Sequence, residues 1–146
     1  MENSQVEILL VEDDVDDAEM TIDAMRKNNL ANKLIHIEDG EEALDFLFGT
    51  GKYVDRDVNI KPRLILLDLK MPKVNGMEVL EKVKSNAITK KIPVVILTSS
   101  KEDPDVSRCY ELGANGYIVK PVDFEGFNKA VIELGLYWLL LNQPPV

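Results

Sequence analysis

Acidic side chains directly follow two of the short apolar runs in this sequence. Glu12 and Asp13 come after the run at 8–11, and Asp68 comes after the run at 64–67. Carboxylates that are packed together repel one another, so such a group needs a bound cation or a shifted protonation state. Ligation by carboxylate oxygens with positions left open for water is typical of Mg²⁺. These residues therefore predict a magnesium site, provided that the fold brings them together.

A hydroxyl group and an amine follow two further apolar runs. Thr98 comes after the run at 94–97, and Lys120 comes after the run at 117–119. A lysine can act as a point charge on one phosphoryl oxygen, and a hydroxyl can donate to another. A central carboxylate can itself be the nucleophile and form an acyl phosphate. In-line phosphoryl transfer needs mainly positioning and charge neutralisation, so the combined set predicts phosphoryl transfer to an aspartate.

The elements that must position these side chains alternate along the chain. Short apolar runs without polar interruption are typical of strands that are buried on both faces. Strands are expected at 8–11, 34–37, 64–67, 94–97 and 117–119. Amphipathic helices are expected near 16–28, 43–48, 77–83, 106–112 and 124–141. This alternation predicts an α/β fold with a parallel sheet, and ligands of such sheets bind beyond the carboxyl ends of the strands.

The charge of the chain excludes two classes of partner. Its 146 residues fit one domain, and the net charge is −9. Nine acidic residues precede the first basic residue, Arg26. They are Glu2, Glu7, Glu12, Asp13, Asp14, Asp16, Asp17, Glu19 and Asp23. No basic face is available for nucleic acid, and this end of the chain would be repelled by an anionic membrane surface.

Cysteine content and the start of the chain favour a cytoplasmic protein. The single cysteine, Cys109, allows no intrachain disulfide, which fits a reducing compartment. Its simplest role is that of a small core residue on the fourth helix. The first residues are polar and acidic, so no secretory signal is expected. The longest apolar run, 136–141, is far shorter than the roughly 18 residues of a membrane span.

Four segments in order resemble the receiver domain of two-component response regulators. They read ILLVEDD, LLDLKMPKVNG, VVILTSS and YIVKP, and the resemblance runs from about Glu7 to Leu134. It implies a flavodoxin-like receiver fold, which is a doubly wound, five-stranded parallel sheet in the order 2-1-3-4-5. A single receiver domain over 1–146 is expected, with a core of about 7–134 and an apolar helical extension to about 142.

The resemblance assigns roles to the carboxylates. Asp68 is similar to the aspartate that accepts the phosphoryl group in this family. Asp13 is expected to be a direct Mg²⁺ ligand, Glu12 to act through water, and the backbone carbonyl of Lys70 to be the remaining protein ligand beside Asp68. Lys70 and Ser100 hold the two positions that tune the lifetime of the phosphoryl group. Their pairing differs from that of the chemotaxis regulator, so the lifetime does not carry over.

The resemblance also identifies the switch residues. Thr98 corresponds to the switch hydroxyl and Lys120 to the phosphate-binding lysine. Tyr117 stands where the family has its aromatic switch, although an aromatic residue of an edge strand is the simpler alternative. The peptide bond between Lys120 and Pro121 is expected to be cis.

A stand-alone response regulator is the function that this resemblance implies. A sensor histidine kinase would phosphorylate Asp68 in the presence of Mg²⁺, and the surface of the fourth helix, fifth strand and fifth helix would then bind a partner or dimerise. Such a protein is a phosphoacceptor and not an enzyme, although its own pocket can catalyse phosphoryl transfer and dephosphorylation. The acidic start, the insertion at 49–63, the segment SSKEDPDV and the apolar C-terminal segment are similar to receivers that are paired with bacterial phytochrome kinases.

Several residues have a simple structural interpretation as well. Asp16, Asp17 and Glu19 are expected to do no more than favour the positive end of the first helix, whereas Asp14 adjoins the predicted pocket. His36 is expected to be a partly buried or surface residue of the second strand. The segment 134–141 carries no charge, so it either packs beneath the long loop or forms a homodimer surface.

Three other functions remain to be compared with the receiver. A flavin carrier shares the topology, but the acidic residues at 12–14 would repel the flavin phosphate. An aspartyl phosphatase is faintly suggested by Asp14-Val15-Asp16, but Ala18 stands where that motif has a hydroxyl or valine. A receiver-like module that docks without phosphorylation stays open, since the sequence does not exclude it.

Overall fold

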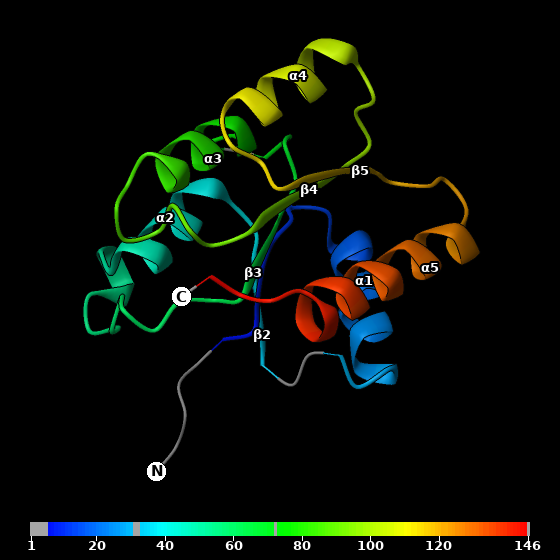
Figure 1. Cartoon of the computed structure of the whole chain (residues 1–146), viewed down its shortest axis with the longest axis horizontal. Coiled ribbons are helices and arrows are strands. Elements are labelled where there is room, and N and C mark those ends of the chain that lie inside the picture. The colour runs from blue at the N-terminus through cyan, green and yellow to red at the C-terminus, as the bar shows by residue number, and fades with distance from the viewer. Residues whose placement is uncertain (1–5, 31–32, 72, 146) are drawn as a thin grey trace.

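Five parallel strands form the single sheet of the computed structural model, which describes residues 6–30, 33–71 and 73–145 (Figure 1). Glu2, one of the acidic residues counted above, lies outside the described residues. The strands are β1 (Ile8–Val11), β2 (Leu34–Ile37), β3 (Leu64–Leu67), β4 (Val94–Thr98) and β5 (Gly116–Val119). Their order is β2-β1-β3-β4-β5, and every neighbouring pair is parallel. The predicted α/β class and strand order are confirmed.

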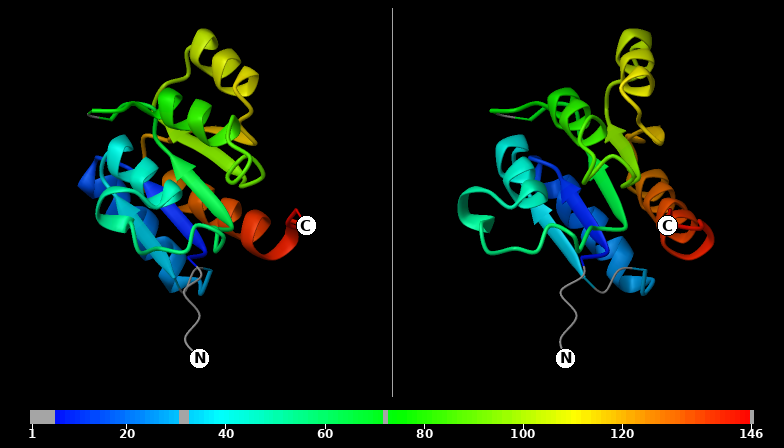
Figure 2. Two further views of the ribbon diagram at one scale, coloured as in Figure 1. Left: turned by 90° about the vertical axis from the view of Figure 1, so that its left-hand side faces the viewer. Right: turned by 60° about the vertical axis from the view of Figure 1, so that its left-hand side comes forward.

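Helices cover both faces of the sheet (Figures 1 and 2). The helices are α1 (Val15–Lys27), α2 (Gly40–Phe48), α3 (Gly76–Lys84), α4 (Asp103–Glu111) and α5 (Phe124–Gly135). Residues of α2, α3 and α4 share one buried cluster with the sheet, and residues of α1 and α5 share the other. Cys109 lies fully buried in the first of these clusters, as predicted. The sheet is thus doubly wound.

Polar side chains cap the starts of several helices. The Asp14 carboxylate accepts a hydrogen bond of 3.0 Å from the backbone N–H of Asp17, so Asp14 is the N-cap of α1. Asn75 and Glu78 form a reciprocal capping box at the start of α3. Such caps satisfy backbone donors that the helix itself leaves unpaired. They fix the first turns of α1 and α3 beside the carboxyl ends of β1 and β3.

The long loop at 49–63 is ordered against α2 and the end of the chain. It contains a short 3₁₀ helix, η1 (Gly51–Tyr53), and the Arg56 guanidinium lies 4.0 Å above the ring of Phe46. Arg63 donates a 2.9 Å hydrogen bond to the carbonyl of Leu139 in the π-helical segment η2 (Leu136–Leu141), which continues α5. This segment therefore packs beside the end of the loop, as one of the two alternatives predicted. No helix among the described residues has the length and apolar character needed to cross a membrane.

The start of α3 lies against the backbone of Asp68 at a distance that only glycine allows. A Cβ atom added at Gly76 would lie 2.2 Å from the Asp68 carbonyl oxygen and 2.6 Å from the Cα of Leu69. The Gly76 N–H also donates to the Leu69 carbonyl, at 2.9 Å. The segment that carries Asp68 is therefore held in place by the first residue of α3.

Replacing Gly76 with alanine is expected to lower the free energy of unfolding by about 1–3 kcal/mol, the usual range for overpacking. This loss should exceed the gain in helix propensity, which is at most about 1 kcal/mol. Urea denaturation of the two proteins measures the difference. Gly116→Ala is the control, since its added Cβ would lie 3.5 Å from Val95, an ordinary contact. An equal change in both variants would contradict the prediction.

Candidate functional site

Three carboxylates meet at the carboxyl end of the sheet. Val11 of β1 and Leu67 of β3 are paired in register, so Glu12 and Asp68 emerge side by side. Oxygen atoms of Glu12, Asp13 and Asp68 all lie within 4.8 Å of one another. Glu12 is 2% exposed and Asp68 8%, whereas Asp13 is exposed at the rim. The three residues predicted to form the metal site are thus brought together.

Lys120 reaches into this group from the end of β5. Its Nζ lies 2.7 Å from Glu12 Oε1, 2.8 Å from Asp17 Oδ2 and 3.3 Å from Asp68 Oδ2. Its backbone N–H donates to the Thr98 carbonyl at 2.7 Å, which fixes the root of the side chain beside β4. An ammonium group has three N–H donors, so each of them faces a carboxylate.

Burial and the neighbouring charges shift the pKa values of Glu12 and Lys120. Burial raises the pKa of Glu12 from 4.5 to about 8, and the neighbouring Asp68 adds to this effect, while Lys120 opposes it. Burial alone would lower the pKa of Lys120, but its hydrogen bonds to Asp17 and Glu12 outweigh burial, so the pKa is raised. Both shifts favour the bound proton, on Glu12 chiefly because the carboxyl is buried and on Lys120 because it is hydrogen-bonded to carboxylates. A cation bound here would relieve the repulsion between Glu12 and Asp68.

One oxygen of Asp68 is anchored by the backbone that follows it. Oδ1 accepts hydrogen bonds from the N–H groups of Leu69 at 2.7 Å and Lys70 at 3.4 Å, while Oδ2 faces Lys120. The carboxylate is therefore oriented before any reaction takes place, as a nucleophile requires. The side chain of Lys70 is exposed and, with Asp13, lines an open groove along this edge of the sheet.

A chain of hydrogen bonds connects the end of β4 with α4. The Thr98 hydroxyl is fully buried and accepts a long hydrogen bond of 3.5 Å from the N–H of Ser100. The Ser100 hydroxyl donates to Asp105 Oδ2 at 2.5 Å, in the first turn of α4. Tyr117 is half-buried and its hydroxyl donates to the Ser100 carbonyl at 2.8 Å. The predicted switch residues are therefore linked to one another and to α4.

Asp17 is a site residue that the sequence analysis missed. It was assigned only to the favourable start of the first helix, yet its carboxylate contacts Lys120. Side chains of a helix point back toward its N-terminus, so a residue in the first turn of α1 can reach over the end of β1. Its place in that first turn, next to a strand that ends in carboxylates, is the signal that could have identified it. Asp14, in contrast, caps the helix.

The expectation of a cis peptide bond between Lys120 and Pro121 is wrong, since the described residues contain no cis peptide bond. The trans form of such a bond is favoured by about 0.5–1 kcal/mol unless its surroundings oppose it. Here Lys120 makes its backbone bond to Thr98 and its contacts with the carboxylates with the bond in the trans form. Of the two alternatives expected for His36, partly buried or at the surface, the structure shows the first, and its Nε2 lies 2.7 Å from the carbonyl oxygen of Glu12.

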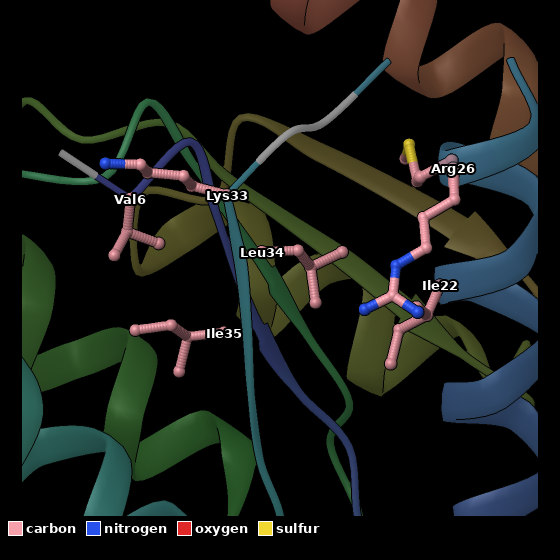
Figure 3. A pocket seen from close by; sticks show the side chains of 7 residues that line it. Val6, Ile22, Arg26, Lys33, Leu34 and Ile35 are labelled. Carbon is pink, nitrogen blue, oxygen red and sulfur yellow. The ribbon is translucent and has the colours of Figure 1, made fainter. Parts of the chain in front are cut away.

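A separate hollow lies at the other end of β2 (Figure 3). Leu34, which pairs with the first residue of β1, lies in its lining, so the hollow is one strand length away from Glu12. Its lining is apolar with two basic residues. The residues are Val6, Ile22, Met25, Arg26, Lys33, Leu34 and Ile35. Because none of them is a carboxylate or a hydroxyl, this hollow does not share the chemistry of the acidic group.

Comparison with known proteins identifies the family. The model of the response regulator receiver domain matches residues 8–132. The chain belongs to the response regulator receiver family. Response regulator Rcp1 of Synechocystis sp. is 39% identical over 132 residues, which cover 90% of this chain and 88% of Rcp1. The flavin carrier and the aspartyl phosphatase are left without support.

Solved structures of similar receivers agree with this assignment. The Mn²⁺-bound form of Rcp1 superposes with a TM-score of 0.88 at 37% identity, covering 95% of this chain and 98% of that one. The phosphorylated cyanobacterial phytochrome response regulator RcpA gives 0.90 at 33% identity, with coverages of 98% and 100%. The bacteriophytochrome response regulator RtBRR gives 0.76 at 50% identity, with coverages of 97% and 84%.

The acidic group of this receiver fits a hard divalent cation such as Mg²⁺ or Mn²⁺. Its donors are carboxylate oxygens, which such cations prefer, and the exposed position of Asp13 leaves the site open to water. Glu12 and Asp68 supply negative charge from the buried side.

The stability of the metal-free protein is expected to fall as the pH rises from about 5 to about 8. The pKa of Glu12 is 4.5 when unfolded and about 8 when folded, so the folded state binds the proton more tightly and loses this advantage over that interval. Lys120 stays protonated throughout. Urea denaturation in the presence of a chelator, at a series of pH values, measures the slope. In Glu12→Gln the slope should become shallower, and an unchanged slope would contradict the assignment to Glu12.

Proposed function

We propose that Asp68 accepts a phosphoryl group from the phosphohistidine of a sensor histidine kinase. The observation that carries this proposal is the environment of Asp68 in a chain of the receiver family. The side chain is nearly buried, one oxygen is fixed by two backbone N–H groups, and the other faces Lys120. In the transfer, an oxygen of Asp68 bonds to phosphorus while the bond from phosphorus to the histidine nitrogen breaks, and the kinase keeps the electron pair on its imidazole.

The charge of the transferred group is balanced by groups already at the rim. Lys120 supplies a positive charge next to Asp68, and Thr98 supplies a hydroxyl donor at the end of β4. Glu12, Asp13, Asp68 and the backbone carbonyl of Lys70 would hold Mg²⁺, which when bound neutralises phosphoryl oxygens. Lys70 lies two residues after Asp68, and Ser100 lies two residues after Thr98. These two side chains would set how long the acyl phosphate survives.

The hydrogen-bond chain from Thr98 to α4 would carry the signal outward. A phosphoryl oxygen offers Thr98 a stronger acceptor, so the end of β4 moves toward Asp68. Ser100 then moves with it, and Ser100 holds both Tyr117 and Asp105. The surface formed by α4, β5 and α5 would change as a consequence. Two arrangements that differ by a few kcal/mol are enough for such a switch.

The kinase that we propose is of the phytochrome type. Relatives at 33% and 50% identity are named as a phytochrome and a bacteriophytochrome response regulator, and these similarities extend over 97% or more of this chain. The phosphoryl transfer from this kinase would take place in the cytoplasm. The protein would then act as a receiver whose phosphorylation state is recognised by other proteins.

The segment η2 is proposed to bind a second copy of the chain. Its residue Leu139 is buried, but Leu140 and Leu141 are exposed, the latter by 75%. Leu136 and Tyr137 are also exposed, and the whole segment lacks charge. Apolar surface that is grouped in this way is typical of protein interfaces, and a surface that pairs with itself gives a two-fold dimer.

Incubation with acetyl phosphate and Mg²⁺ should add one phosphoryl group to the wild-type protein, as read by intact mass. Asp68→Asn should remove this addition because the nucleophile is lost. Asp23→Asn is the matched control, since Asp23 is an exposed residue of α1, and it should behave like the wild type. Addition that survives in Asp68→Asn would overturn the proposed phosphoacceptor.

Leu141→Glu should shift the protein from dimer toward monomer, because a charge would enter the proposed apolar interface. Light scattering coupled to size-exclusion chromatography, at several concentrations, measures this. Val54→Glu introduces the same charge at an equally exposed residue outside η2 and should leave the mass unchanged. A wild-type protein that stays monomeric well above micromolar concentration would refute the dimer.

A further inference from the structure

Asp17, in the first turn of α1, forms an ion pair with Lys120, whereas the other two carboxylates that contact Lys120 follow strand ends. The distance of 2.8 Å is shorter than the 3.3 Å between Lys120 and Asp68, although Asp68 is the residue proposed to react. The Asp17 side chain is 26% exposed and that of Lys120 is 9% exposed, so the pair is largely shielded from water. The ammonium group thus gives one of its three donors to a carboxylate that lies on α1.

The backbone of Asp17 is held within α1 by bonds that do not involve Lys120. Its N–H donates to the Asp14 carboxylate at 3.0 Å, and its carbonyl accepts a 2.9 Å hydrogen bond from the Thr21 hydroxyl. Each bond joins a side chain of the first turns to the backbone of Asp17, and the Asp17 carboxylate contacts Lys120. The helix therefore places the root of a negatively charged side chain next to Lys120.

We propose that Asp17 is a positioning residue that holds Lys120 in the resting protein and competes with the phosphoryl group for its charge. This inference rests on the proposed function, since it concerns the lysine expected to neutralise the phosphoryl group on Asp68. In the resting state, the contacts with Glu12 and Asp17 keep Lys120 at a longer distance from Asp68. Once a dianionic phosphoryl group is attached, Lys120 must direct more of its charge toward it, and Asp17 opposes this.

The proposal requires that Asp17 act in opposite directions on the two kinds of ligand. A carboxylate close to the rim repels a phosphoryl group and draws Lys120 away from it, but it attracts a divalent cation. Neutralising Asp17 should therefore strengthen the binding of a phosphoryl analogue and weaken the binding of Mg²⁺. A residue that served only to stabilise α1 would, on removal, loosen the pocket and weaken both.

Asp16 provides a matched control. It precedes Asp17 in the same first turn of α1 and carries the same charge. Its side chain is exposed, and no contact between it and Lys120 occurs in the described structure. Any effect of helix-start charge or of net charge is therefore shared by Asp16→Asn and Asp17→Asn, whereas an effect through Lys120 belongs to Asp17→Asn.

Calorimetric titration of beryllium trifluoride at saturating Mg²⁺, and of Mg²⁺ alone, tests the proposal. Asp17→Asn should bind beryllium trifluoride about three- to fivefold more tightly than wild type, the scale of a partly exposed ion pair. The same variant should bind Mg²⁺ more weakly by a similar factor, while Asp16→Asn should change neither by more than a minor part of this. Asp17→Ser, which removes the charge with a different shape, should repeat the result if Asp17→Asn is poorly folded.

The outcomes separate this inference from the function on which it rests. If the wild type takes up neither beryllium trifluoride nor a phosphoryl group from acetyl phosphate, the proposed function fails. If the wild type binds the analogue and Asp17→Asn matches Asp16→Asn, only the role of Asp17 is overturned. Weaker binding of both ligands by Asp17→Asn and Asp17→Ser would also overturn it, because that result is the signature of a structural role.

Discussion

Lys120 extends from the end of β5 to carboxylates that follow β1, lie on α1 and follow β3. The pairing of these buried charges at the carboxyl end of the sheet depends on this one side chain. Buried charges are costly unless they are paired, and here one ammonium group faces Glu12, Asp17 and Asp68 together. The pairing requires that β1 and β3 lie side by side and that their ends stand at the same level. The parallel order β2-β1-β3-β4-β5 meets that requirement. The topology is therefore the means by which distant acidic residues become one site.

The strands and the three carboxylates of the site could be predicted from the sequence, because the end of a strand is marked by the residues at that point of the chain. The apolar runs fixed the strands, and Glu12, Asp13 and Asp68 follow them directly, so their convergence required only that the sheet be parallel. The contact of Asp17 with Lys120 depends on how α1 turns after β1, so its first-turn position marks Asp17 as a candidate site residue but does not give its partner. The incorrect cis bond before Pro121 came from the family resemblance and not from a physical argument. The insertion at 49–63 was recognised in the sequence, but its packing on Phe46 was not predicted.

The structure divides into a densely packed part and a more weakly held helix. Residues of β1, β3 and β4 are almost entirely buried, and α3 contributes several residues to the same cluster. In α4 only Cys109 is buried among the nine residues of the helix. A helix with so few buried side chains needs little free energy to move. The hydrogen bond between Ser100 and Asp105 therefore contributes a larger part of the attachment of α4 than it would for a helix with many buried side chains.

The close approach of α3 to Asp68 also limits how this protein can change over evolutionary time. Because the first residue of α3 touches the backbone of Asp68, a side chain there cannot be gained without moving the segment that carries the Asp68 carboxylate. We therefore expect glycine to be retained at position 76 wherever the backbone position of Asp68 is retained, although Gly76 begins α3 and Asp68 lies in the loop after β3. A descendant that gains a side chain at position 76 is expected to displace Asp68 from its place at the end of the sheet.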